Sequence, residues 1–326
     1  MGPVTGAADR RYMAAALALS ERGRAQTGTN PNVGCLIVRD GRSVGRGWTQ
    51  AGGRPHAEAM ALAQAGDAAQ GATAYVTLEP CAHQSPRGPT CAESLIAAGL
   101  ARVVIALTDP DPRTHGAGIA RLQAAGLHVE TGLEAEAARR AMAGWLMQQQ
   151  HGRPLVTLKL ATSLDGCIAR ENGESKWITG DAARAHSHLE RSRQTLILVG
   201  RGTLDADSPR LDVRLAGLEA RSPARAVLTR GSAPQGWQAL HALEQIMALT
   251  GVQYLMIEGG AETAAAFLKA GLVDRLLLYR APILIGRGKA CLADIGLGQL
   301  GDAHGQWRQI DSRPLGKDQF ELYERA

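Results

Sequence analysis

Short runs of aliphatic residues alternate with alanine-rich segments of helical character along this chain of 326 residues. In the first half, strands are expected at 34–41, 43–50, 72–80, 102–107 and 128–133. Helices are expected from Asp9, as N-cap, to about Glu21, from His56 to Gly66, from Thr90 to Leu100, and over 118–126 and 134–150. Strands that alternate with helices predict a layered α/β fold.

A second series of the same kind follows the short link HGRP at 151–154. Its strands are expected at 155–166, 195–200, 223–231, 252–260 and 274–286, with a helix over about 181–193. A chain of this length exceeds the usual size of one domain. We therefore predict two α/β domains, at 1–150 and 151–326.

Charge and composition exclude several classes of protein. The formal net charge is only +5, and the basic residues are scattered, which favours a solvated surface over a nucleic-acid-binding one. No apolar run approaches the roughly 20 residues of a membrane span. The N-terminal stretch MGPVTGAADRRYM lacks the apolar core of a signal peptide. The five cysteines lack paired spacing, so we expect reduced thiols in the cytoplasm.

One group of residues suggests a metal site. His56 and Glu58 stand at the start of a predicted helix, Cys81 follows a predicted strand, and Cys91 lies in the first turn of the next helix. Two cysteines and one histidine around Zn²⁺ leave a fourth position for water, as in catalytic zinc sites. Because a helix N-terminus stabilises anions, we expect Cys91 to ionise readily.

Each of these residues alone has an ordinary explanation. A histidine at a helix start is usually a cap or surface residue, and two cysteines ten apart are often buried packing residues. Together, H-A-E followed by P-C matches the signature of zinc deaminases, in which the glutamate transfers protons and does not bind the metal.

The longer motifs resemble a known family. PHAE and EPCAHQSPRGPTC are similar to the deaminase half of the bifunctional riboflavin-biosynthesis deaminase–reductases, as are TNPNVGCLIV and DPDPRTHGAGIARLQAAGLHV. KLATSLDG, GESKWITG, RGTLDADSPRLDVR and IEGGAETAAAFLKAGLVD resemble the reductase half. The resemblance extends over nearly the whole chain.

The resemblance implies a cytidine-deaminase-like three-layer α/β/α domain followed by a dihydrofolate-reductase-like α/β domain. It implies deamination of a phosphoribosylaminopyrimidine, then NADPH-dependent reduction of its ribosyl group. It also implies that the chain forms a homo-oligomer. His56, Cys81 and Cys91 would hold one Zn²⁺, Glu58 would transfer protons, and Asn30 would contact the substrate.

In the reductase half, the resemblance implies three sets of residues. The cofactor would contact Ala161, Trp177, Thr203, Asp207, Thr229, Gly260, Ala261, Glu262, Thr263, Ala264, Ala265 and Ala266. The substrate would contact Ser175, Arg191, Leu211, Arg214 and Glu258. Lys159, Asp207 and Glu258 are candidates for polarising or proton-transfer roles. Arg230 either binds the cofactor's 2′-phosphate or is an ordinary charged residue of a loop.

Three positions of the deaminase half have open roles. Some relatives carry histidine where this chain has Thr49. In the loop between Cys81 and Cys91, Arg87 is the only basic residue apart from His83. His83 is either a phosphate contact or an ordinary loop histidine.

Two other functions compete with this interpretation. A nucleic-acid-editing deaminase with a C-terminal binding module would predict a basic, aromatic second half, which this chain does not have. A catalytically silent zinc scaffold would be expected to lack Glu58, which is present.

Overall fold

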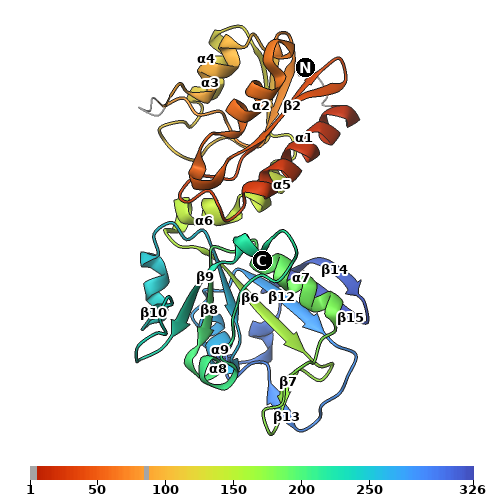
Figure 1. Cartoon of the computed structure of the whole chain (residues 1–326), viewed down its shortest axis with the longest axis vertical. Coiled ribbons are helices and arrows are strands. Elements are labelled where there is room, and N and C mark those ends of the chain that lie inside the picture. Colours follow the sequence, from red (N-terminus) through yellow and green to blue (C-terminus); the bar gives the residue numbers. More distant parts are fainter. Residues whose placement is uncertain (1–5, 84–87) are drawn as a thin grey trace. The chain divides into compact units, whose positions relative to one another are not determined.

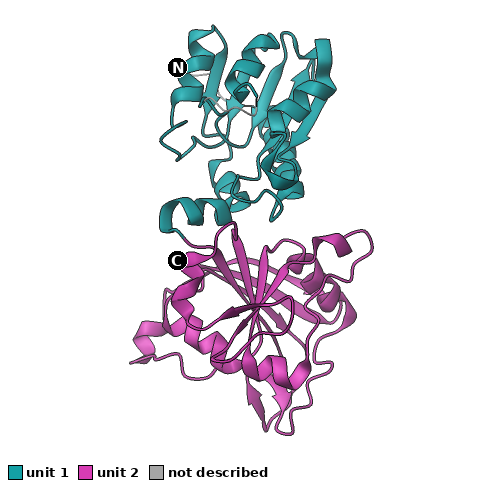
Figure 2. Cartoon of the chain, turned by 60° about the vertical axis from the view of Figure 1, so that its left-hand side comes forward, with its two compact units in different colours: residues 1–152 teal, residues 153–326 magenta. Residues whose placement is uncertain are grey.

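The chain forms two compact units, Met1–Gly152 and Arg153–Ala326, in a computed structural model that describes residues 6–83 and 88–326 (Figure 2). The sequence placed the boundary after residue 150. Within the described residues, no helix has both the length and the apolar character needed to cross a membrane.

Unit 1 is built on a five-stranded sheet with the order β2-β1-β3-β4-β5. The strands are β1 (Gly34–Arg39), β2 (Arg42–Trp48), β3 (Thr73–Val76), β4 (Arg102–Ile105) and β5 (His128–Thr131). The helices are α1 (Ala7–Ser20), α2 (Ala57–Ala65), α3 (Cys91–Ala97), α4 (Ala117–Ala124), α5 (Ala135–Ala141) and α6 (Ala143–His151). β1 pairs antiparallel with β2 and β3, whereas β3, β4 and β5 run parallel.

Glycines let two helices approach this sheet closely. A Cβ at Gly34 of β1 would overlap the carbonyl oxygen of Ala16 in α1, and a Cβ at Gly47 of β2 would overlap that of Ala57 in α2. Gly47 pairs with Cys35, the neighbour of Gly34, so the two glycines face opposite sides of the sheet. Helices therefore cover both faces, as a three-layer α/β/α arrangement requires (Figure 1).

The start of α1 differs from the prediction. Gly6 is the N-cap, and Asp9 lies in the first turn, where its Oδ2 accepts a hydrogen bond from the Gly6 N–H at 3.3 Å. Asp9 also binds the Arg102 guanidinium at 2.9 and 3.0 Å and accepts from the Tyr75 hydroxyl. Because Asp9 binds these residues, which are distant in sequence, it lies in the first turn of the helix and not at its N-cap. The predicted N-cap Thr90 is confirmed, since its Oγ1 accepts from the Glu93 N–H at 3.2 Å.

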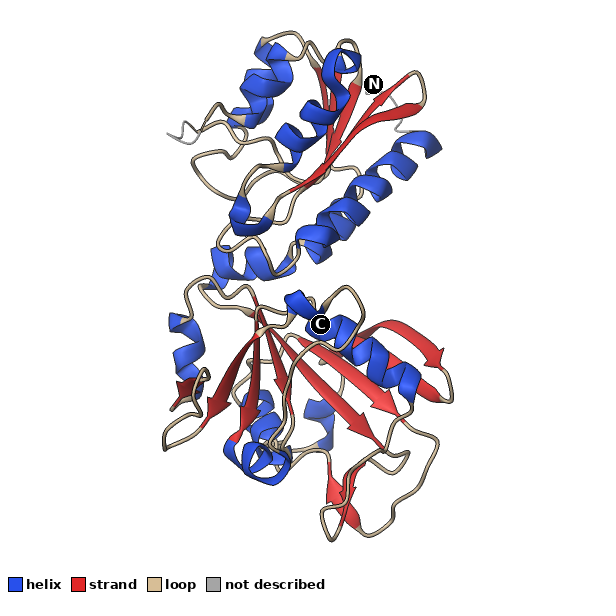
Figure 3. Cartoon of the chain, in the orientation of Figure 1, coloured by secondary structure: helices blue, strands red, loops and turns tan. Residues whose placement is uncertain are grey.

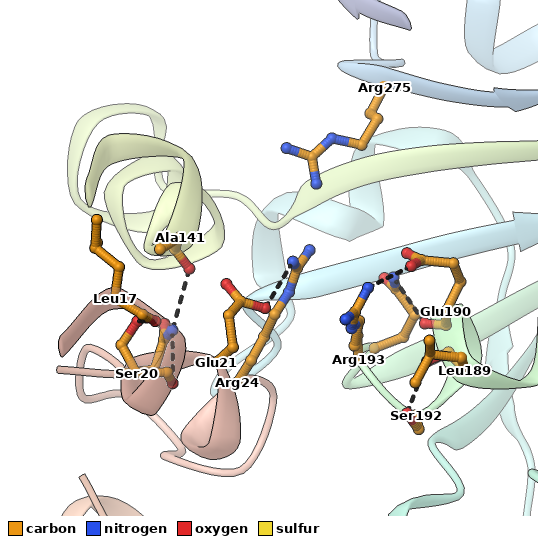
Figure 4. Close-up of polar contacts among 12 residues, drawn as sticks. Leu17, Ser20, Glu21, Arg24, Ala141, Leu189, Glu190, Ser192, Arg193 and Arg275 are labelled. Carbon is orange, nitrogen blue, oxygen red and sulfur yellow. Dashed lines mark hydrogen bonds and ion pairs between the residues drawn. The ribbon is translucent and has the colours of Figure 1, made fainter. Parts of the chain in front are cut away.

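Two predicted elements are interrupted. The strand predicted over 72–80 ends at Val76, so Cys81 lies in the following loop. The helix predicted over 134–150 breaks at Met142 into α5 and α6. At this break Asn32 Nδ2 donates to the Ala141 carbonyl at 3.1 Å and to that of Ser20 at 3.3 Å, so a side chain supplies a donor beside the interrupted helix (Figure 4 labels Ala141 and Ser20).

Unit 2 contains an eight-stranded sheet with the order β10-β9-β8-β11-β6-β12-β15-β14. Its strands are β6 (Leu155–Thr162), β8 (Leu196–Gly200), β9 (Ala224–Leu228), β10 (Gln238–Leu240), β11 (Tyr254–Glu258), β12 (Arg275–Arg280), β14 (Trp307–Leu315) and β15 (Asp318–Arg325). β7 (Cys167–Arg170) and β13 (Gly288–Ala290) form a separate antiparallel pair. The helices are α7 (Asp181–Arg191), α8 (Arg201–Asp207) and α9 (Ala261–Lys269).

Helices cover both faces of this sheet too (Figure 3). Leu196 and Leu198 of β8 pack in one core cluster with Phe267 of α9, whereas the intervening Ile197 packs in another with Ala183 of α7. The strands from β10 to β12 run parallel, and β15 and β14 join antiparallel. All residues of β8 and β11 are buried, which explains why both sequences are apolar apart from Glu258 at the end of β11.

We predict that Gly47→Ala destabilises unit 1 by about 1–3 kcal/mol, because the added methyl group must push α2 away from β2. Calorimetric unfolding of the full chain measures this change. Gly301→Ala is the matched control, since no atom lies within 4 Å of a Cβ at that position and its φ is not positive. Equal stability of the two variants would contradict the close-packing explanation.

Candidate active sites

The predicted zinc ligands come together at the start of two helices. His56 is the N-cap of α2, Cys91 is the first residue of α3, and Cys81 lies in the loop between β3 and α3. His56 Nδ1 lies 3.2 Å from Cys91 Sγ and 3.7 Å from Cys81 Sγ. The donor atoms of all three residues lie within 4.8 Å of one another.

This donor set fits zinc. Tetrahedral coordination with Zn–N near 2.0–2.1 Å and Zn–S near 2.3 Å separates neighbouring N and S ligand atoms by about 3.6 Å. The two distances from His56 Nδ1 bracket that value. One imidazole and two sulfurs also leave a fourth position for water, which is the composition of a catalytic site.

Without a metal ion, the start of α3 favours ionisation of Cys81 over that of Cys91, the residue expected to ionise. The Cys91 N–H, at the start of α3, donates to Cys81 Sγ at 3.4 Å. Hydrogen bonds from the Cys91 thiol and from His56 lower the pKa of Cys81 to about 4, despite its burial. The hydrogen bond to Cys81, together with burial, raises the pKa of Cys91. The helix terminus thus stabilises the neighbouring thiolate rather than that of its own residue.

Glu58 lies beside this cluster, in the first turn of α2. The residue is only 3% exposed, and burial raises the pKa of its carboxyl group. Glu58 and the donors His56 and Cys81 line a cavity of about 540 Å³. A buried carboxyl group with a raised pKa, close to a zinc site, is suited to transferring protons.

Most other predicted residues of this half also line the cavity. Asn30, Thr49 and His83 do so. Thr49 Oγ1 accepts from the Val33 N–H at 2.9 Å, which gives this hydroxyl a structural partner. His83 Nδ1 lies 3.1 Å from Thr114 Oγ1. Arg87 lies outside the described residues.

The sequence analysis assigned no role to Asp109, Asp111 or Arg113, which line the same cavity. Burial raises the pKa of Asp109 to about 6. Asp111 forms an ion pair with Arg113 at 2.5 Å. The DPDP segment, cited only for its resemblance, was the signal that could have identified them.

The Glu79 carboxylate connects the chain segments beside this cavity. Its carboxylate accepts hydrogen bonds from the backbone N–H groups of Asp109, Gly116, Gly118 and Ile119, at 2.9–3.2 Å. These bonds join the loop that carries Cys81 to the start of α4. Glu79 therefore has a structural role.

A second cavity, of about 450 Å³, lies in unit 2. It is lined by eight of the predicted residues, Lys159, Ala161, Ser175, Trp177, Arg191, Asp207, Leu211 and Arg214. Sequence reasoning did not identify Lys176, Arg184, His188 and Tyr279, which also line it. Their separate positions in β12, α7 and a loop give no local motif.

Glu258 lies behind this cavity and is bound to two of its cations. The Arg191 guanidinium contacts both carboxylate oxygens, at 2.6 and 2.8 Å, and Lys159 Nζ lies 3.7 Å away. Burial alone would raise the pKa of Glu258, but the charges of Arg191 and Lys159 hold it at about 2. Glu258 is therefore ionised at neutral pH.

The remaining predicted cofactor residues lie outside the lining of this cavity. Thr203 lies against the Gly259–Gly260 turn, where added Cβ atoms would be 2.9 and 3.0 Å from its side chain. The side chains of Thr263, Ala264 and Ala265 are buried. Gly260 and Ala261, at the start of α9, are half-buried and Glu262 is exposed, whereas Thr229 and Ala266 line a different cavity of unit 2.

Comparisons with known proteins match both halves of the chain. Residues 7–107 match the cytidine and deoxycytidylate deaminase zinc-binding region, and residues 154–319 match the RibD C-terminal domain. The riboflavin biosynthesis protein RibD of Escherichia coli K12 is 39% identical, over 95% of this chain and 97% of that protein. RibD of Aquifex aeolicus is 36% identical, over 89% and 91%.

Solved structures agree with these matches. Acinetobacter baumannii RibD, form 1, superposes with a TM-score of 0.87 at 35% identity and covers 98% of this chain and 99% of its own. A deaminase/reductase from Thermotoga maritima gives a TM-score of 0.86 at 27% identity, over 97% and 98%. The predicted fold classes are confirmed, as are zinc and NADPH as cofactors. This chain belongs to the RibD family of riboflavin biosynthesis proteins.

Proposed function

We propose that this chain catalyses two consecutive reactions of riboflavin biosynthesis. Unit 1 hydrolyses the 2-amino group of 2,5-diamino-6-(5-phosphoribosylamino)pyrimidin-4(3H)-one to give 5-amino-6-(5-phosphoribosylamino)uracil. Unit 2 reduces the ribosyl group of that product to ribityl with NADPH. The observation that best supports this proposal is the cluster of His56, Cys81 and Cys91 beside the buried Glu58. The Thermotoga maritima neighbour is described as a deaminase and reductase of these compounds.

In unit 1, His56, Cys81 and Cys91 hold the metal and Glu58 moves protons. Zinc, when bound, lowers the pKa of a water molecule in its fourth position. The Glu58 carboxylate takes a proton from the attacking water and passes it to the ring nitrogen. It then assists the loss of ammonia. Asn30, which lines the same cavity, contacts the substrate.

In unit 2, Lys159 is the cation best placed to polarise the substrate. NADPH supplies the hydride when it is bound. Lys159 Nζ lies 5.9 Å from the centre of the Tyr279 ring and is held by Glu258. Because Glu258 is ionised, it positions Lys159 and Arg191 instead of donating a proton. Asp207 lines the same cavity, where it contacts the cofactor.

Of the two arginines predicted to contact the substrate, Arg214 is better suited to bind its phosphate group. The Arg191 guanidinium already binds Glu258, and its Nη1 donates to the Asp212 carbonyl at 3.1 Å. Arg214 has a 46% exposed side chain, with one ion pair to Asp212 at 2.5 Å. Ser175 and Leu211 line the same cavity and complete the substrate contacts.

The cellular location, the oligomeric state and the class of ligand are also part of this proposal. The chain acts on small molecules in the cytoplasm, as a homo-oligomer, and does not bind nucleic acid. The match of the second half to the RibD C-terminal domain supports a reductase there, in place of a nucleic-acid-binding module.

We predict that Glu58→Gln lowers ammonia release by about 10²- to 10⁴-fold, because the amide cannot accept the proton from water. NADPH oxidation on the deaminated substrate should be unchanged, as should zinc content. Separate assays of ammonia and NADPH measure both activities. Loss of both reactions in a folded variant would count against two separable sites.

Removal of one ligand should remove the metal. Cys81→Ala is expected to lower zinc from about one ion per chain to a small fraction of that, because two protein ligands bind zinc weakly. Elemental analysis of the purified protein measures this. Cys291→Ala is the matched control, since this half-buried cysteine belongs to unit 2 and not to the cluster. Full zinc content in Cys81→Ala would exclude Cys81 as a ligand.

Arg214→Ala should raise the KM of the reductase for its phosphorylated substrate by about 10- to 100-fold, since a charge-assisted contact contributes about 1.5–3 kcal/mol. Steady-state kinetics with the substrate and with its dephosphorylated analogue measure the difference. The analogue should be used equally by the variant and the unaltered chain. An equal loss with both compounds would show that Arg214 does not bind the phosphate.

A further inference from the structure

The cavity beside the zinc ligands of unit 1 is lined by cations and carboxylates, and most of these charged groups already have partners. Arg113 binds Asp111, and its Nε contacts both carboxylate oxygens at 3.0 Å. The Glu79 carboxylate accepts from four backbone N–H groups, and Asp109 Oδ1 accepts from the Asp111 N–H at 2.8 Å. These groups therefore satisfy one another or the backbone within the wall of the cavity.

Arg54 differs from the other charged residues of this wall. It lines the same cavity and is half-buried, but among the residues that the structure describes its guanidinium has no hydrogen-bond or ion-pair partner. A charged group that has lost part of its water gains from an anionic partner, and a guanidinium offers five N–H donors to one. Arg54 is therefore available to an anionic ligand, whereas Arg113 would first have to leave Asp111.

The backbone that carries Arg54 is held in place on both sides. The Gln50 N–H donates to the Pro55 carbonyl at 3.1 Å, which closes a short loop around Arg54. Gly53, with φ +89°, packs so closely on Asn30 that a Cβ there would overlap the Asn30 side-chain amide. Arg54 thus starts from a fixed point next to Asn30, the residue expected to contact the substrate.

The position of Arg54 suits a group that is joined to the substrate but does not react. Arg54 precedes His56 by two residues, so the Cα atoms of the two residues lie within about 7 Å of each other. The long arginine side chain lets its charge lie in the cavity without taking part in the cluster of metal ligands. In the proposed substrate, the ribose separates the phosphate from the pyrimidine ring that reacts. A cation in the wall near the metal ligands can therefore hold the phosphate while the ring lies at the metal.

We propose that Arg54 binds the phosphate group of the substrate in unit 1 and makes the deaminase selective for the phosphorylated compound over its dephosphorylated analogue. This inference rests on the proposed deaminase function. A guanidinium can bind a phosphate through two parallel N–H···O hydrogen bonds, which fix direction as well as charge. With the phosphate held at Arg54, the carbon that bears the 2-amino group is directed to the metal ligands beside Glu58.

The test compares ammonia release from the phosphorylated substrate with that from its dephosphorylated analogue, using the full zinc-loaded chain. The variants are Arg54→Ala, Arg54→Gln and Arg54→Lys, and elemental analysis measures the zinc content of each. Arg46→Ala is the matched control. Arg46 is an exposed arginine of β2 that does not line the cavity, and its side chain has no partner within the described part of the chain.

Arg54→Ala and Arg54→Gln should each raise the KM for the phosphorylated substrate by about 10- to 100-fold. The kcat, the zinc content and the KM for the analogue should change by less than about twofold, because the reacting end of the cavity is unaltered. Arg54→Lys should recover part of the loss, since lysine keeps the charge but not the paired N–H groups. Arg46→Ala should behave as the unaltered chain does.

Two results would overturn the phosphate contact and leave the deaminase function standing. One is an equal rise in KM for both compounds, which would show that Arg54 only supports the shape of the cavity. The other is a fall in kcat at unchanged KM, which would place Arg54 at the reacting end. If Arg54→Ala lost its zinc, Arg54→Gln, which keeps most of the side-chain length, would supply the same comparison. Failure of the unaltered chain to release ammonia from either compound would overturn both the deaminase function and this inference.

Discussion

The approach of α2 to β2 is the contact on which the deaminase site depends. Gly47 places the start of α2 against the sheet, at a distance that a Cβ would prevent. His56 and Glu58 are attached to that end of the helix, the first as its cap and the second in its first turn. Two residues so close in sequence would face different sides of a long helix. Here the N-terminus itself points at the cluster, so both reach it.

Each unit also contains a buried carboxylate that organises its site, and the two carboxylates are neutralised differently. Glu79 is surrounded by backbone N–H groups, which fix the loop next to Cys81. Glu258 is surrounded by the side chains of Arg191 and Lys159, which it holds at the edge of the substrate cavity. A charge buried without such partners would be costly. Both groups therefore make the geometry of their site rigid.

The predictions succeeded where local sequence carries the information. Thr90 caps α3 because the residue types for a capping box are adjacent in sequence, with Glu93 three residues on. They failed where distant contacts decide the outcome. Asp9 lies within α1 because Arg102 and Tyr75 bind it, and Asn32 bonds to the carbonyl at the break between α5 and α6. β14 was not predicted, since most of its residues are polar and exposed at the edge of the sheet.

By itself, the sequence determined the two α/β series and the choice of His56, Cys81 and Cys91 as the candidate metal ligands, because periodicity and short motifs are local properties of the chain. It also carried the family resemblance, through motifs spread over nearly its whole length. Only the tertiary structure decided which sulfur receives the N–H of α3 and that Glu258 is an ionised partner of Arg191. These pairings join residues far apart in sequence, and their energies depend on burial and direction, which no local pattern records.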